Sequence, residues 1–159
     1  MVVRNIALQD LPFVWKMLYQ ALYVPHGEPP WPEDIVSEPV IAKYLDGWGR
    51  PGDLGLIGEL DQNAVGAVWL RTFDLAHAGY GYVDDDTPEL SIAVVPECRG
   101  HGLGSALMSA IESQALKAGY ASISLSVDYR NPARRLYQRL GYREVGVGGT
   151  SAIMKKELR

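Results

Sequence analysis

The chain has 159 residues, of which 47% are hydrophobic and 21% charged, a composition typical of a globular domain with enough apolar side chains for a core. Its formal net charge of −4 and calculated isoelectric point near 5.3 argue against a nucleic-acid partner. A single cysteine, Cys98, excludes an intrachain disulfide and a thiolate metal cluster, and no apolar stretch approaches the ~20 residues of a membrane span, so we expect a cytoplasmic protein without a signal peptide.

The first half of the chain predicts a strand, two helices and a hairpin. Asp10 is expected to cap the first helix, because Pro12 then falls in its first turn and apolar side chains recur at helical spacing. Four prolines and a glycine exclude regular structure between the two helices, and the sequence Asp-Gln-Asn joins two apolar runs into an antiparallel hairpin. The expected elements are a strand at residues 2–8, helices at about 11–22 and 38–46, a loop at 24–34, and strands at 54–60 and 64–73.

The second half alternates strands and helices after a polar connection at residues 74–88. Glycines stop both helices, at Gly119 and Gly141, and Pro132 falls in the first turn of the second helix. This order predicts one α/β (α+β) domain over residues 1–159, built on a mixed sheet. The expected elements are strands at 89–95 and 121–127, helices at 103–119 and 132–141, and a closing hairpin of strands at 142–147 and 151–158.

A glycine-rich loop joins the strand at 89–95 to the following helix, with the sequence Arg-Gly-His-Gly-Leu-Gly-Ser at residues 99–105. The glycines leave backbone N–H groups open to a bulky ligand, and the start of a helix adds the positive end of its dipole. Together with Arg99 they predict an anion site. Two known phosphate loops do not fit, because one requires Gly-Lys-Ser/Thr and the other requires glycine where Ser105 stands.

Two motifs resemble the GNAT superfamily of acyl-coenzyme A N-acyltransferases. Arg99, Gly102 and Gly104 match its R-x-x-G-x-G pyrophosphate loop, and the preceding strand at 90–97 is similar to the family's. Residues 131–142, Asn-Pro-Ala-Arg-Arg-Leu-Tyr-Gln-Arg-Leu-Gly-Tyr, resemble its second motif. The resemblance implies a cofactor core at about 89–142 and a mostly antiparallel sheet of about seven strands flanked by about four helices. It also implies that the sheet splays where acetyl-CoA, the cosubstrate, binds without a metal.

The resemblance also implies which residues hold the cofactor. In the family a bulge in the strand before the loop splays the sheet, and a backbone N–H there, best assigned to Val94, bonds the thioester oxygen. Asn131 would bond the pantetheine arm, although a helix cap explains it equally well. The full set implied is Ile92, Val94, Val95, Arg99, Gly100, His101, Gly102, Leu103, Gly104, Ser105, Asn131 and Tyr137.

Two residues are candidates for the chemistry. The resemblance places Tyr137 beside the sulfur, where a phenol could protonate the departing thiolate; the alternative is a tyrosine that only packs. Glu89 opens the strand before the loop, where the family often carries a carboxylate that takes the proton of the amine through water. Its alternative is an ion pair at a strand end.

For most other ionisable residues the sequence favours a position on the surface over a catalytic role. Asp84, Asp85 and Asp86 are expected in a solvated turn, although one of them could help to attract a cationic amine. His26 and His77 are expected on surface loops. Cys98 at a helix start could form an acyl-enzyme, but it belongs to the cofactor loop and the family transfers the acyl group directly.

Two functions follow from these motifs. The first is an N-acetyltransferase acting on a primary amine of a small molecule or a protein, and the second is a catalytically silent module that binds acyl-CoA as a sensor. The presence of both Tyr137 and Glu89 favours the enzyme. Homodimers are frequent in the family, and no motif identifies the amine.

Overall fold

The computed structural model describes residues 1–159 and places seven strands in one sheet, in the order β1-β2-β3-β4-β5-β7-β6. All neighbouring strands are antiparallel except β4 and β5, which are parallel, so the expected mostly antiparallel mixed sheet is confirmed. The strands are β1 (Val2–Asn5), β2 (Leu54–Leu60), β3 (Asn63–Arg71), β4 (Glu89–Val94), β5 (Ser122–Asp128), β6 (Arg143–Gly148) and β7 (Ser151–Glu157).

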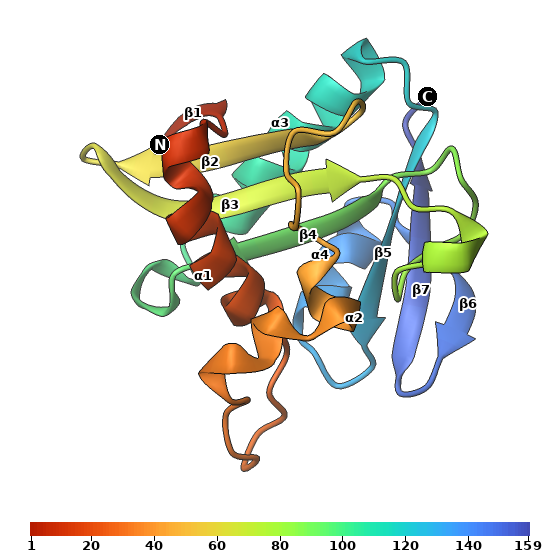
Figure 1. The fold of residues 1–159 in the computed structure, drawn as a ribbon, viewed down its shortest axis with the longest axis horizontal. Coiled ribbons are helices and arrows are strands. Elements are labelled where there is room, and N and C mark those ends of the chain that lie inside the picture. The colour runs from red at the N-terminus through yellow and green to blue at the C-terminus, as the bar shows by residue number, and fades with distance from the viewer.

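Four α-helices cover the two faces of the sheet (Figure 1). The helices are α1 (Leu11–Ala21), α2 (Pro39–Ala42), α3 (Leu103–Lys117) and α4 (Ala133–Arg139), and short 3-10 turns occupy Leu8–Asp10, Glu33–Ser37, Leu75–His77 and Pro96–Cys98. Helices α1 and α2 lie on one face, and α3 and α4 lie on the other. No helix is long and apolar enough to cross a membrane.

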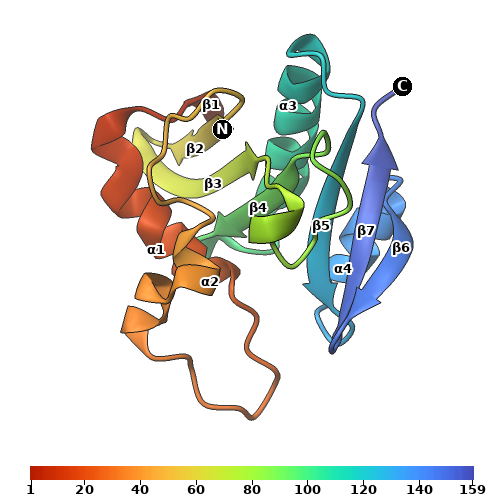
Figure 2. The same ribbon diagram turned by 45° about the vertical axis from the view of Figure 1, so that its right-hand side comes forward.

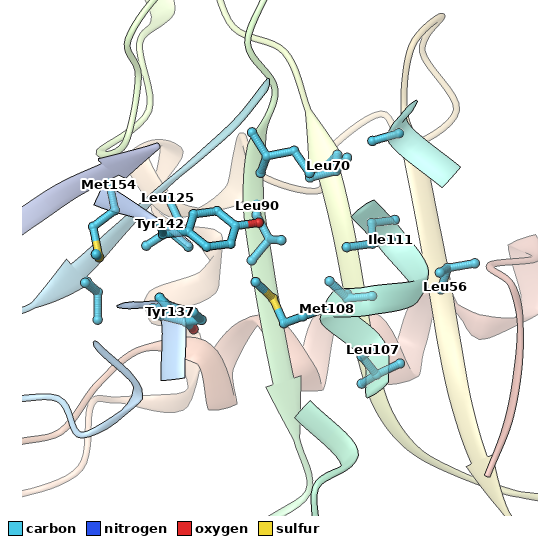
Figure 3. Close-up of a cluster of buried hydrophobic side chains, with 14 of the residues drawn as sticks. Leu56, Leu70, Leu90, Leu107, Met108, Ile111, Leu125, Tyr137, Tyr142 and Met154 are labelled. Atoms are coloured by element: carbon cyan, nitrogen blue, oxygen red, sulfur yellow. The ribbon is translucent and has the colours of Figure 1, made fainter. Parts of the chain in front are cut away.

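The two cores follow from the alternation of side chains along the central strands. On β3, Ala67 and Trp69 join the cluster under α1, whereas Val68 and Leu70 join the cluster under α3. Figure 3 shows Leu107, Met108 and Ile111 of α3 against this second face. Because β3 and β4 are covered on both sides, they form the rigid centre on which the neighbouring cleft is built.

Strands β4 and β5 separate soon after they meet. They share one residue pair, Glu89 with Ser124, and the Ser124 N–H donates to the Pro88 carbonyl at 3.0 Å. The ladder between β3 and β4 runs from Gly66–Val94 to Arg71–Glu89 without a register shift. The splay is therefore present as expected, but the expected bulge in β4 is wrong.

The Gly79–Gly81 segment lies between Glu89 and the backbone of β5. A Cβ atom on Gly81 would fall 2.7 Å from the Leu125 carbonyl carbon and 2.8 Å from the Ser126 nitrogen, and 3.1 Å from the Glu89 carboxyl carbon. Only glycine allows such a close backbone approach. This segment therefore fills one end of the space between the two strands.

The second helix is much shorter than its sequence predicts. Instead of residues 38–46, α2 covers Pro39–Ala42 and is followed by turns. After Lys43 the bonds tighten, because the Tyr44 and Leu45 N–H groups donate to the carbonyls three residues before them. Side chains of β3 then satisfy the carbonyl groups that lack a partner past the helix end: Arg71 Nη1 donates to those of Lys43 and Asp46, at 3.0 and 2.5 Å, and Trp69 Nε1 donates to that of Tyr44 at 3.0 Å.

The first strand and the first helix also differ from expectation in detail. The strand ends at Asn5 rather than near residue 8, and the Asp10 side chain does not cap α1. Its carboxylate instead accepts from the Ala7 N–H at 2.7 Å and pairs with both terminal nitrogens of Arg4. The Asp10 carboxylate is thus engaged by Arg4 and by the backbone that precedes the 3-10 turn, and it does not reach the N–H groups of α1.

Candidate active site

A cleft of about 480 Å³ opens where β4 and β5 separate. Fifteen of its 22 lining residues are hydrophobic, and its volume lies within the roughly 300–1,000 Å³ typical of small-molecule sites. Both faces of β4 contribute to it, through Glu89 and Ser91 on one side and Leu90 and Ile92 on the other. One wall comes from β5 and α4 and the other from α1, α2 and the segment between them. The cleft thus joins β4 and the second predicted motif to the unassigned N-terminal third, whereas no residue of the loop at 99–105 lines it.

Glu89 lies in this cleft and is only 4% exposed. Its Oε2 accepts a hydrogen bond from the Tyr44 hydroxyl at 2.6 Å, and the Tyr44 hydroxyl in turn accepts from the Tyr80 N–H at 2.7 Å. Glu89 Oε1 has no hydrogen-bond partner. One oxygen is therefore held in place and the other is free to accept a proton. The alternative of an ion pair at a strand end is not observed, because no basic side chain pairs with Glu89.

Burial raises the pKa of Glu89 to about 7, which is the dominant effect on this group. The Tyr44 hydrogen bond and the charge of Lys43 act in the opposite direction. The Gly81 N–H also favours the carboxylate, although its geometry falls short of a hydrogen bond. A carboxyl group with this pKa exists in both protonation states near neutral pH, as a general base requires.

Tyr137 also lines the cleft, on α4, and is 9% exposed. It packs edge-on against Tyr142, with ring centroids 6.1 Å apart. Burial raises its pKa to about 12, and no residue of the protein bonds its hydroxyl. The side chain thus combines the packing role with a protonated hydroxyl in the cleft.

Asn131 also lines the cleft, but its side-chain oxygen is already used. It accepts a hydrogen bond from the Ala133 N–H at 3.0 Å, at the start of α4. The side-chain oxygen of Asn131 therefore caps the helix, which was the alternative to binding the cofactor. The side-chain amide nitrogen has no protein partner and is the group that could bond a ligand.

The backbone of the glycine loop is surrounded by open space on the side where a ligand could approach. Gly100 and Gly102 have φ angles of 82° and 79°, in the left-handed region, and a Cβ atom on either would meet no atom within 4 Å. At Gly104 the nearest atom would be Leu136 Cδ2, at 3.8 Å. Gly102 precedes α3 and no side chain caps the helix, so its first N–H groups are available to an anion. These features fit a pyrophosphate.

Arg99 turns back from this loop toward the sheet and α1. Its Nε donates to the Val94 carbonyl at 3.0 Å, and Nη2 donates to Gln20 Oε1 at 3.2 Å. The remaining loop residues, His101, Leu103 and Ser105, are at least partly accessible.

Two N–H groups of β4 face the splay. The Val95 N–H donates to the Val65 carbonyl of the neighbouring strand at 2.8 Å. Because successive N–H groups along a strand point to opposite sides, those of Ile92 and Val94 point away from β3, toward β5.

The remaining ionisable candidates lie away from the cleft. Asp84, Asp85 and Asp86 line a separate hollow, so the expectation that one of them joins Glu89 in attracting the amine is wrong. His26, His77 and His101 are exposed, and His77 pairs with Asp74 at 2.8 Å. Cys98 is partly buried against the core, and no histidine bonds it.

Several residues of the cleft belong to no motif in the sequence. Tyr44 holds Glu89 and stacks on Tyr80, with ring centroids 6.5 Å apart, yet it occupied an ordinary apolar position of an expected helix. Trp31 and Glu38 also line the cleft from the proline-rich segment and the start of α2. The one available signal was the Gly-Tyr-Gly sequence at 79–81, since paired glycines often mark a close backbone approach.

The chain is similar to known acetyltransferases along nearly its whole length. A sequence profile of the acetyltransferase (GNAT) family matches residues 15–142. An uncharacterised N-acetyltransferase of Methanocaldococcus jannaschii is 29% identical over 146 residues, covering 91% of this chain and 79% of that protein.

Two solved structures show the same fold. Ribosomal-protein-alanine N-acetyltransferase from Brucella melitensis superposes with a TM-score of 0.72 at 20% identity, covering 99% of both chains. A putative acetyltransferase from Salmonella typhimurium, solved with acetyl-CoA, gives a TM-score of 0.68 at 22% identity, covering 100% of this chain and 94% of the other. With a family match across most of its length and a shared fold, the chain belongs to the GNAT family of acetyltransferases and is an acetyl-CoA-dependent acyltransferase.

Proposed function

We propose that the protein transfers an acetyl group from acetyl-CoA to a primary amine by direct attack of the amine on the thioester. The observation that carries this proposal is the free Oε1 of buried Glu89, in the same cleft as the Tyr137 hydroxyl. The cleft thus offers both a proton acceptor and a proton donor. A silent binding module would have no use for a buried carboxylate that destabilises the fold when charged.

Glu89 is the proposed general base. An amine arrives as its cation and must lose a proton before its nitrogen can form the C–N bond, and Glu89 accepts this proton directly or through a water. The nitrogen loses a second proton as the C–N bond forms and the C–S bond breaks, and the departing sulfur takes up one proton. The products are therefore the amide, the free thiol and the one proton that Glu89 passes to solvent. The pKa of about 7 lets the carboxylate release its proton to solvent between turnovers.

Tyr137 is proposed to assist the leaving group. Its pKa of about 12 makes it a weaker acid than a thiol, whose ordinary pKa is about 8.5. Its help therefore begins as a hydrogen bond to the departing sulfur rather than as complete proton transfer. The N–H groups of Ile92 and Val94 face the splay, and Val94 is the proposed donor to the thioester oxygen.

The loop at 99–105 is the proposed pyrophosphate site, and the amide nitrogen of Asn131 is proposed to bond the pantetheine arm. Acetyl-CoA supplies the acetyl group as an activated thioester when bound. In this arrangement residues 89–142 form the cofactor core of one N-acetyltransferase domain over residues 1–159. The acceptor then enters from the side of α1 and α2, as a small molecule or an exposed amine of a protein.

Binding of the cofactor is tested by Gly104→Val, with calorimetry of coenzyme A. Gly104 has helical backbone geometry, and a Cβ there meets its nearest neighbour only at 3.8 Å. The variant should therefore fold, while its side chain narrows the approach to the helix start. We expect at least about 10-fold weaker binding, which corresponds to the loss of about 1.4 kcal/mol. Gly102→Val is a poorer test, because its positive φ would also strain the backbone.

Turnover is tested by release of free thiol from acetyl-CoA in the presence of a panel of primary amines. The proposal predicts amine-dependent thiol release that matches the amide formed. Tight binding of coenzyme A without any amine-dependent release would instead establish the silent module. A folded protein that ignores millimolar coenzyme A would overturn the cofactor site itself.

A further inference from the structure

The side of the cleft that faces α1 and α2 carries a distinct chemistry. Three large hydrophobic side chains that are exposed to solvent, Trp31, Val40 and Tyr80, line this one cleft with exposed fractions of 45%, 52% and 57%. Leu18, Leu22 and other apolar residues continue the surface inward. Apolar side chains gathered at the mouth of a concave site favour an apolar ligand.

The wall that presents Trp31 is fixed by hydrogen bonds. The Trp31 carbonyl accepts from the Tyr19 hydroxyl at 2.5 Å, and its indole Nε1 donates to the Tyr23 carbonyl at 3.2 Å. The Tyr23 hydroxyl donates to the Arg130 carbonyl at 3.1 Å, which links this wall to the loop before α4. The apolar surface is therefore preformed, and a ligand need not order it on binding.

The charges of the cleft have one sign. Glu38, Glu89 and Asp128 line it, and no lysine, arginine or histidine does. Asp128 is neutralised by Arg130 at 2.9 Å, which leaves Glu38 at the mouth and Glu89 inside without a basic partner. Lys43, whose charge acts on Glu89 from outside the lining, donates to the Ala78 carbonyl at 2.6 Å. A ligand with a carboxylate or phosphate would thus meet carboxylates and no counter-charge.

We infer that the acceptor is a primary amine on an apolar body, aromatic or branched aliphatic, that carries no anionic group. This inference rests on the proposed function, since it assigns the amine end to Glu89. The ammonium group then approaches the Glu89 carboxylate, and the body packs among Trp31, Val40 and Tyr80. A polyamine lacks such a body and would leave these hydrophobic side chains uncovered.

Matched amines test the inference. 2-Phenylethylamine, L-phenylalanine and spermidine present respectively the apolar body alone, the same body with a carboxylate, and a polycation. We expect kcat/KM for 2-phenylethylamine to exceed that for phenylalanine at least about 100-fold, because an added like charge costs several kcal/mol. It should exceed that for spermidine by at least about 10-fold. Equal or better use of phenylalanine or spermidine, in an enzyme that acetylates amines, overturns this inference and leaves the proposed function intact.

A variant pair tests the place of binding. Val40 and Val145 are similarly exposed, at 52% and 54%, but only Val40 lines the cleft, whereas Val145 lies on β6. Val40→Lys should raise KM for 2-phenylethylamine at least about 10-fold through lost apolar contact and charge repulsion. The affinity for acetyl-CoA should be unchanged, and Val145→Lys should behave as the wild type. Equal effects of the two variants would place the acceptor elsewhere.

Calorimetry keeps the inference testable if none of the amines is turned over. The protein saturated with coenzyme A should bind 2-phenylethylamine more tightly than phenylalanine, and Val40→Lys should abolish the difference. Absence of turnover alone contradicts the proposed function, whereas equal binding of the two amines contradicts the acceptor class.

Discussion

At the scale of single residues, the proposed mechanism depends on how the Tyr44 hydroxyl holds Glu89. This hydroxyl donates to Oε2 at 2.6 Å and so favours the charged carboxylate, against the effect of burial. We therefore propose Tyr44 as a positioning residue, because it contacts Glu89, the proposed base, and its hydroxyl is already engaged with the Tyr80 N–H. Its removal should change both the orientation of the carboxylate and its pKa.

Tyr44→Phe is expected to raise the pKa of Glu89 above its wild-type value of about 7. Since only the deprotonated form accepts a proton, kcat/KM should rise with pH through a higher midpoint than in the wild type. The pH profile of kcat/KM measures this shift. Tyr82→Phe is a suitable control, because the Tyr82 hydroxyl bonds Asp85 outside the cleft. A slower enzyme with an unmoved midpoint would reduce Tyr44 to a packing residue.

Tyr137→Phe should lower kcat roughly 10- to 1,000-fold, because the variant lacks a hydrogen bond to the departing sulfur. The affinity for acetyl-CoA should change little, since the ring remains packed against Tyr142. Steady-state kinetics with chemistry shown to be rate-limiting measures the effect. Unchanged kcat under those conditions would remove the hydroxyl from the mechanism.

Residue identities were predictable only where a motif fixed them. Glu89, Tyr137 and the glycines were found because a strand, a loop and a helix follow one another in the order of a known family. Tyr44, Trp31 and Val40 come from residues 31–44, where no motif exists and where the observed contacts join positions far apart in the chain. No local pattern encodes the pairing of Tyr44 with Glu89, which are 45 positions apart.

At the scale of secondary-structure elements, the separation of β4 from β5 creates the cleft. The sequence predicted both strands and the helices that follow them, because each is a clear apolar run ended by glycine or proline. It did not predict the end of α2, where the turns that follow the helix are held by Arg71 and Trp69 of β3, side chains far away in the sequence. Nor did it predict that Gly81 lies against β5, a contact between segments more than 40 positions apart.

Gly81→Ala tests the role of this segment. Its Cβ would lie 2.7 Å from the Leu125 backbone, so either β5 or the segment must move. Such overpacking typically costs about 1–3 kcal/mol of stability. Gly146→Ala, where the nearest atom would be 3.6 Å away, is the matched control. Denaturant unfolding should show the loss only for Gly81→Ala, and equal stability of the two variants would contradict the close packing.

At the scale of the whole molecule, the two halves of the chain contribute different parts of the proposed reaction. The C-terminal half carries the glycine loop, β5 and α4, on the proposed cofactor side, and the N-terminal half carries α1 and α2, on the proposed acceptor side (Figure 2). Glu89 is the first residue of β4, which lies between these two groups of elements. The fold class followed from the order of elements, whereas the acceptor side required the tertiary structure.

The pH dependence of kcat/KM for the wild type and Glu89→Gln tests the central claim most directly. The wild-type curve should rise through a midpoint of about 7, the pKa of the buried carboxyl group. Glu89→Gln should lack this rise, with its greatest deficit near neutral pH and partial recovery toward about pH 10, where more of the amine is already deprotonated. Curves that stay parallel from about pH 6 to 10 would contradict the assignment of Glu89 as the base.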